Sequence, residues 1–156
     1  MRGIRRFCIP LAAAALLLTV WGGRADAFWG FADSREAERS GLDLVQGFDR
    51  NTVVNISGPV AVPPRPIAGG MIAVDLKLPD EQIIVVLGPD WYLQDDDLDW
   101  KVGDRVTVRG SLARGKDGRA YLLSQQVTMP GGTTIELRGQ NGAPSWSAAG
   151  RGGPQP

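Results

Sequence analysis

The chain has 156 residues, of which 17 are basic and 17 acidic, with no histidine and a single cysteine, Cys8. This composition excludes haem attachment through C-x-x-C-H, zinc sites built from Cys and His, and Ser-His-Asp or Cys-His catalysis. It also excludes an intramolecular disulfide, so we expect neither an enzyme nor a bound cofactor.

The first 27 residues have the three-part pattern of a signal peptide. Arginines come first, an apolar run fills residues 7–21, and Ala25 and Ala27 provide the small residues of a cleavage site. A short membrane anchor is the alternative, although helices that span a bilayer need roughly 20 apolar residues. Both interpretations predict an exported protein, in the periplasm or a compartment continuous with it.

A flexible segment is predicted over residues 28–41. Its aromatic start, residues 28–31, could associate with a membrane interface. Beyond the leader, 13 basic residues face 16 acidic ones, because four Arg and one Asp lie in residues 1–27. Nucleic acid is therefore not an expected partner, since it is bound mainly by clustered Lys and Arg.

Short β-branched runs between turn signals then predict strands. We expect strands over residues 52–57 and 59–62, followed by an exposed loop at residues 63–66, where three prolines cannot continue a central strand. Residues 71–78 and 82–87 predict a hairpin. The second of these strands is apolar on both faces and should be central in the sheet.

Residues 89–101 mix aromatic residues with carboxylates and predict one helical or irregular turn. Strands are expected again over residues 105–112 and 120–128, joined by a tight turn rich in glycine, and over residues 133–138.

This order predicts an all-β fold over residues 42–147. The expected architecture is a small OB-like barrel of five or six strands, with one short helix between strands 3 and 4. A small β-sandwich is the alternative. Residues 148–156 are rich in Gly, Pro and Ala and are predicted to be a disordered tail.

Three blocks of sequence carry a family resemblance. They are LGPDWYL at residues 87–93, GDRVTVRGS at 103–111 and LRGQNGAPSW at 137–146. Together they resemble the family of exported bacterial OB-like domains that includes the magnetosome protein MamS and the C-terminal part of MamX.

The resemblance implies a binding or interaction module that acts in magnetite crystal maturation, in the periplasm or in the magnetosome lumen or membrane. Other magnetosome or inner-membrane proteins are the implied partners. MamX-type members carry C-x-x-C-H haem motifs, which this chain lacks, so electron transfer is not implied.

A run of carboxylates is the candidate metal site. Its alternate spacing is similar to the start of an EF-hand loop, but Trp100 and Val106 stand where that loop needs Gly and Glu. Weak binding of iron or calcium is one hypothesis, and a solvated acidic loop is the other. The candidate ligands are Asp95, Asp96, Asp97 and Asp99.

Aromatic side chains are the candidate interaction residues. They could stack on bases, sugars or a peptide, which leaves an oligonucleotide- or oligosaccharide-binding OB domain as a further alternative. They could equally close the end of the barrel as core residues. The candidates are Trp91, Tyr92, Trp100 and Trp146.

Overall fold

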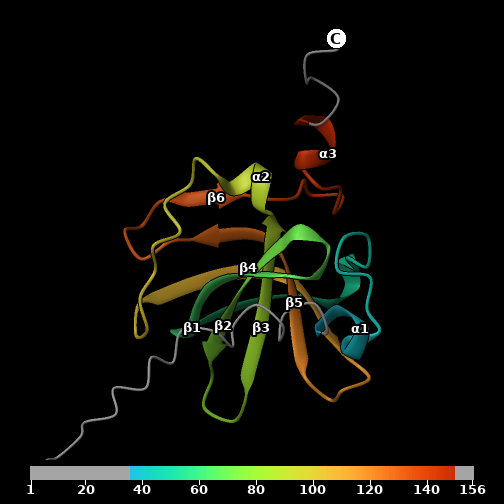
Figure 1. Ribbon diagram of the computed structural model, residues 1–156, viewed down its shortest axis with the longest axis horizontal. Coiled ribbons are helices and arrows are strands. Elements are labelled where there is room, and N and C mark those ends of the chain that lie inside the picture. Colours follow the sequence, from blue (N-terminus) through green and yellow to red (C-terminus); the bar gives the residue numbers. More distant parts are fainter. Residues whose placement is uncertain (1–35, 150–156) are drawn as a thin grey trace, which may run out of the picture.

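The computed structural model describes residues 36–149 (Figure 1). The predicted signal peptide or anchor, residues 28–35 of the predicted flexible segment, and all but the first two residues of the predicted tail lie outside this range. Within it, α1 (Glu36–Ser40) falls in the segment predicted to be flexible, and Ser40 is fully buried. No helix of residues 36–149 is long and apolar enough to cross a membrane.

Six strands and several short helices follow one another along the chain. The strands are β1 (Val53–Ile67), β2 (Met71–Lys77), β3 (Gln82–Pro89), β4 (Arg105–Arg114), β5 (Ala120–Thr128) and β6 (Thr134–Glu136). The remaining elements are the 3-10 turns η2 (Arg50–Thr52) and η3 (Ala68–Gly70) and the helices α2 (Asp90–Leu93) and α3 (Trp146–Ala149).

Five of the strands close into a barrel. The sheet order is β3-β2-β1-β4-β5-β6, and a parallel pairing of β3 with β5 joins the ends of the five-stranded part. The ring is therefore β1-β2-β3-β5-β4, with β6 added beside β5. This confirms the predicted small OB-like barrel with α2 between the third and fourth strands, and the alternative of a β-sandwich is wrong, because one sheet closes on itself.

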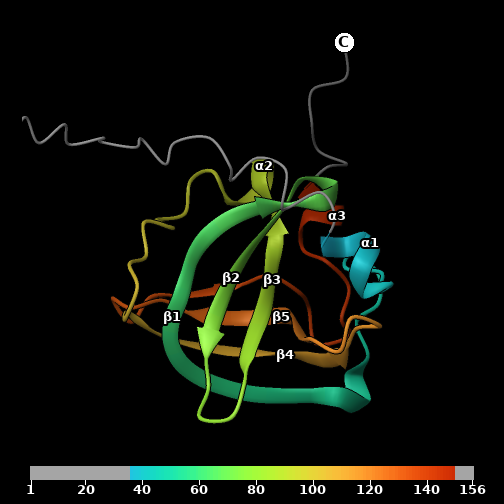
Figure 2. The same ribbon diagram turned by 60° about the horizontal axis from the view of Figure 1, so that its bottom comes forward.

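Strand β1 differs from its prediction. The expected loop at residues 63–66 is wrong, because β1 continues through it as one long arc (Figure 2). Residues 53–59 of β1 pair with β4, and residues 60–67 pair with β2. Pro63 and Pro64 lie in the register shift between Val62 and Arg65, and Pro66 pairs with Ile72 of β2. This part of β1 has β2 as its strand neighbour, so one edge of it does not need an N–H donor.

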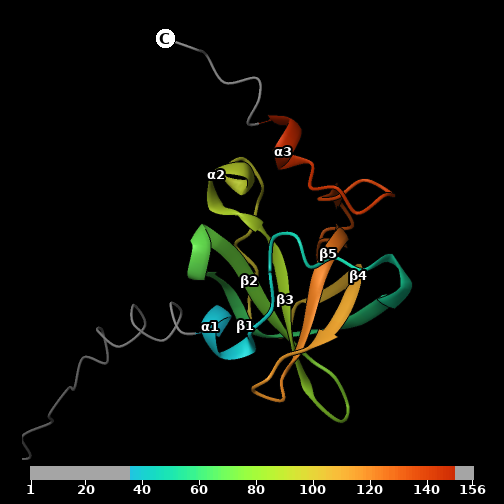
Figure 3. The same cartoon turned by 90° about the vertical axis from the view of Figure 1, so that its right-hand side faces the viewer.

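The predicted hairpin is confirmed. Strands β2 and β3 pair in an antiparallel register from Met71 opposite Pro89 to Lys77 opposite Gln82. Strand β3 is buried along nearly all of its length and lies between β2 and β5, which agrees with the expected central strand. Helices α2 and α3 lie at the end of the barrel opposite the β2–β3 turn (Figure 3).

The interior is one apolar cluster. Burying a branched aliphatic side chain contributes roughly 1.5–3 kcal/mol, so the inward-facing residues of the five strands dominate the stability of the barrel. Those with no exposed surface include Val74, Leu76, Val85, Val106, Val108 and Leu122.

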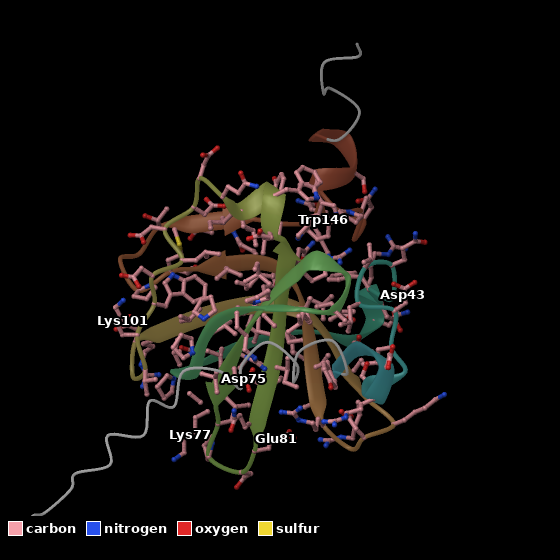
Figure 4. The ribbon with its side chains drawn as sticks, viewed as in Figure 1. Asp43, Asp75, Lys77, Glu81, Lys101 and Trp146 are labelled. Atoms are coloured by element: carbon pink, nitrogen blue, oxygen red, sulfur yellow. The ribbon has the colours of Figure 1, made fainter. Side chains whose placement is uncertain are left out.

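A polar network connects the first three strands. The Asp75 carboxylate on β2 is buried and accepts hydrogen bonds from Arg65 Nη1 at 2.7 Å and Gln82 Nε2 at 2.8 Å (Figure 4). A buried carboxylate is tolerated only when it is paired in this way, so the three side chains fix the relative position of β1, β2 and β3.

Candidate functional site

The four candidate metal ligands lie on the exposed loop between α2 and β4. Asp95, Asp97 and Asp99 are exposed, and Asp96 is half-buried. Asp97 accepts a hydrogen bond from the backbone N–H of Asp99, whose carboxylate pairs with Lys101. In residues 36–149, no group of three or more His, Cys, Asp or Glu side chains is arranged to hold a metal ion. Cation binding by this loop stays a prediction.

Asp96 in this loop has a displaced pKa. Partial burial, followed by the charge of Asp95, raises the pKa of Asp96 above its ordinary value of 3.8. A neighbouring cation would lower it instead. Asp95 and Asp96 therefore repel each other, while Asp99 is paired with Lys101.

The candidate aromatic residues separate into one stack and one isolated ring. Trp91, with 52% of its surface exposed, meets Tyr92 edge-to-face, and Tyr92 lies against Trp146, each pair with ring centroids 5.9 Å apart. Trp146 is buried at the end of the barrel, as Figure 4 shows. Trp100 is buried elsewhere, and its indole N–H donates to a backbone carbonyl at 3.0 Å. Two of the four rings therefore pack as core residues, and Trp91 offers the largest exposed face.

Arg138 extends this stack and was not predicted from the sequence. Its guanidinium lies over the rings of Trp146 and Phe48, with centroid distances of 4.9 and 5.4 Å. Its Nη groups donate to the backbone carbonyls of Val45 at 2.9 Å and Gly142 at 3.3 Å. Arg138 thus joins the loop before β1 to the loop before α3.

Burial of Arg138 disfavours its charged form. Only 2% of the residue is exposed, and its Nε is buried without a hydrogen-bond partner among residues 36–149. Burial lowers the pKa of Arg138 to about 10, although the charge of Asp43 opposes the shift. A buried guanidinium persists when its contacts offset the cost of desolvation, and the Phe48 ring makes one of these contacts.

Phe48 forms one wall of a groove that crosses β4, β5 and β6. The groove has a volume of about 520 Å³ and carries two guanidinium groups, one carboxylate and three carboxamides. Binding sites for small ligands have volumes of this order. The lining residues are Phe48, Arg50, Val53, Arg109, Gln125, Gln126, Glu136 and Gln140.

A β-bulge shapes the floor of this groove. Arg109 pairs with Gln126 and Gly110 pairs with Ser124, so Gln125 is the extra residue of β5. A Cβ atom on Gly110 would lie 2.4 Å from the carbonyl oxygen of Leu123, which means that only glycine fits there. Bulges of this kind redirect a side chain, and here the redirected side chain is Gln125.

Gln125 in turn orients Arg109. Its Nε2 donates to the Gly139 carbonyl at 2.9 Å, and its Oε1 accepts from Arg109 Nε at 3.1 Å. Gln125 as a whole residue is 8% exposed, so its side chain has little freedom to move. Within residues 36–149, the Nη groups of Arg109 have no hydrogen-bond partner and are available to a ligand.

Arg50 reaches the same groove from the turn η2. The carboxylate of Asp49 caps this turn by accepting from the Asn51 N–H at 2.8 Å. Buried Ser111 on β4 anchors the turn, since its hydroxyl accepts from the Asp49 N–H and lies 2.9 Å from the hydroxyl of Thr52. Local capping and one buried hydroxyl therefore hold the turn that brings a second guanidinium to this groove.

A second groove, of about 680 Å³, lies by the β2–β3 turn. Figure 4 shows Lys77 and Glu81 at this end of the barrel, away from Trp146. Exposed Val102 contributes to its apolar wall, and Glu81 on its rim pairs with Arg114 at 3.1 Å. Gln82 in its lining is hydrogen-bonded to Asp75, and its lining contains no arginine.

Comparison with known proteins identifies one family. The sequence pattern of the MamS/MamX magnetosome protein family matches residues 52–135, which is more than half of the chain. The match begins at the end of η2 and includes β1 to β5 and the start of β6, so it contains both strands of the bulge. Among curated proteins, none is similar enough in sequence to count as a relative.

Among solved structures, the crystal structure of apo TiaS (tRNAIle2 agmatidine synthetase) is similar to part of the chain. The two share 15% sequence identity with a TM-score of 0.41. The similarity covers 49% of this chain and 18% of that one. The chain therefore spans less than a fifth of that structure, and a likeness at this level carries no argument about function.

Proposed function

This chain belongs to the MamS/MamX magnetosome protein family, and we propose that it acts in magnetosome formation as a non-enzymatic binding module. Its specific role in this proposal is the maturation of magnetite crystals. The observation that carries the binding role is the groove across β4, β5 and β6, where a bulge and a buried carboxamide hold Arg109 ready for a ligand. Preorganised polar groups of this kind are typical of binding sites.

Three serine hydroxyls make hydrogen bonds within the fold, which supports a non-enzymatic function. The chain has no histidine to activate a nucleophile. Ser111 anchors η2, and the buried hydroxyl of Ser124 donates to the carbonyl of Val86 on β3. Ser57 accepts a hydrogen bond from Thr107 on the neighbouring strand. These hydroxyls hold the barrel together.

We place the protein in the periplasm or in the magnetosome lumen or membrane. The three-part leader pattern of residues 1–27 supports export, and the family supports the magnetosome. Proteins of the magnetosome or the inner membrane are the proposed partners, and residues 28–31 are the proposed contact with the membrane.

Deletion of the gene in a magnetosome-forming bacterium that carries it tests this proposal. Electron microscopy should show crystals of altered size or maturity, and the full chain supplied in trans should restore them. Crystals of unchanged size, shape and number in the deletion strain would contradict a role in crystal maturation.

A further inference from the structure

The groove across β4, β5 and β6 combines charges in a way that selects its ligand. Its lining contains two guanidinium groups, of Arg50 and Arg109, and one carboxylate, of Glu136. The planar fork of a guanidinium matches a carboxylate and can bind it through two parallel hydrogen bonds. The positive excess of the groove therefore favours a ligand that carries a carboxylate.

The remaining lining fits a peptide backbone. The carboxamides of Gln126 and Gln140 each offer both donors and an acceptor, which is the combination that pairs with peptide N–H and C=O groups. Phe48 and Val53 add an apolar wall for an aliphatic side-chain stem. An acidic side chain on a polypeptide would use all three kinds of contact.

The fold also leaves a strand edge next to the groove. β6 ends the sheet order and pairs with β5 alone among the described strands, while Glu136 of β6 lines the groove. An extended segment can lie along such an edge and add main-chain hydrogen bonds. This geometry favours an extended segment over a compact ligand.

The carboxylate of Glu136 disfavours binding of a multiply charged phosphate in this groove. A phosphate group carries more negative charge than a carboxylate, so a carboxylate in the same groove repels it more strongly. The same Glu136 can accept an N–H from a peptide. The groove should therefore attract a ligand whose acidic groups each carry a single negative charge, and this attraction should weaken as salt is added.

We infer that the groove of Arg50, Arg109, Gln125 and Glu136 binds an extended acidic peptide segment of a partner protein, with its carboxylate on Arg109. This rests on the proposed function as a binding module and names the chemistry of its partner. Gln125 is a positioning residue, because it acts by orienting Arg109 on the bulge.

Fluorescence polarisation with the full chain tests this inference. The probe is a fluorescein-labelled Gly-Asp-Gly-Asp-Gly-Asp peptide, and its Gly-Asn counterpart is the uncharged reference. The double variant Arg50→Gln/Arg109→Gln should weaken binding of the Asp peptide by at least about tenfold, since both guanidinium groups contribute. The matched variant Arg105→Gln, at an exposed position at the start of β4 outside this groove, should stay within about twofold of the native protein.

The variant Gln125→Leu separates orientation from charge. It keeps both arginines, so it should weaken the Asp peptide and reduce its preference over the Asn peptide. If the double variant does not fold, the single variant Arg50→Gln, at an exposed position, replaces it and should also weaken binding of the Asp peptide. Binding should also fall as NaCl is raised.

Three results would overturn the inference: equal affinity for the Asp and Asn peptides, equal loss with Arg105→Gln, or competition by inorganic phosphate as strong as that by unlabelled Asp peptide. Absence of binding by the native chain would overturn it as well. An altered crystal phenotype on gene deletion would then leave the proposed function standing, so the two failures are distinguishable.

Discussion

Replacing Arg138 with methionine tests the contact that joins the two ends of the described chain. The change keeps an unbranched buried side chain but removes the hydrogen bonds to the carbonyls of Val45 and Gly142. It also removes the charge from between Phe48 and Trp146.

The expected magnitude follows from these contacts. Hydrogen bonds to a charged group contribute about 1.5–3 kcal/mol each, and the 3.3 Å bond to Gly142 is the weaker of the two. Each ring contact adds about 2 kcal/mol when it is desolvated. Relief of the buried charge, whose desolvation costs several kcal/mol, offsets most of this loss, so we expect the free energy of unfolding to fall by about 2 kcal/mol. That corresponds to a fall in Tm of about 8 °C for a domain of this size.

Urea unfolding followed by tryptophan fluorescence measures the change. Trp146 lies against the guanidinium, so the emission of the folded state should change together with the midpoint. Arg105→Met is the control, because Arg105 is exposed, and it should change the free energy of unfolding by less than about 0.5 kcal/mol. Equal stability of the Arg138→Met variant and the native protein would show that Arg138 does not stabilise the fold by joining these two loops.

Two further predictions concern a glycine and a carboxylate. Gly142→Ala should lower the free energy of unfolding, measured in urea, by at least about 2 kcal/mol, because φ is +84° and a Cβ would lie 2.6 Å from Phe48 Cδ1. Gly132→Ala is the control, because its φ is +87° but the space around it is open, and it should lower the free energy by about 1 kcal/mol. Equal losses in the two variants would refute a steric clash with Phe48. At Asp117, burial opposes ionisation, but hydrogen bonds from the Tyr121 hydroxyl at 2.8 Å and a backbone amide lower the pKa below 3.8. This stabilisation is complete above the unfolded-state pKa and is lost as the pH falls below about 4, so Tyr121→Phe should flatten the acid-induced loss of stability measured by circular dichroism.

The strands of the barrel could be predicted because their signals are local. Alternating apolar residues and the Pro79 turn define the β2–β3 hairpin, and glycines define the turn between β4 and β5. The course of β1 could not be predicted in the same way. Whether proline interrupts a strand depends on whether its N–H is needed by a neighbour, and that depends on barrel closure.

The groove could not be predicted because its parts are far apart in the sequence. Gln125 becomes a positioning residue only through a bulge opposite Gly110, and a bulge is a property of two paired strands. An arginine is expected at the surface from sequence alone, but two loops and two aromatic rings bury Arg138 in the folded protein. The acidic and aromatic candidates were conspicuous in sequence, and among them only Trp91 keeps a broad exposed ring.

We propose that the protein acts in crystal maturation through this groove. The direct measurement is the size distribution of magnetite crystals, by electron microscopy, in a deletion strain that carries the Arg50→Gln/Arg109→Gln variant. We predict crystals like those of the deletion strain, while the Arg105→Gln variant restores native crystals at the same protein level. Native crystals in the strain with the double variant would contradict the claim.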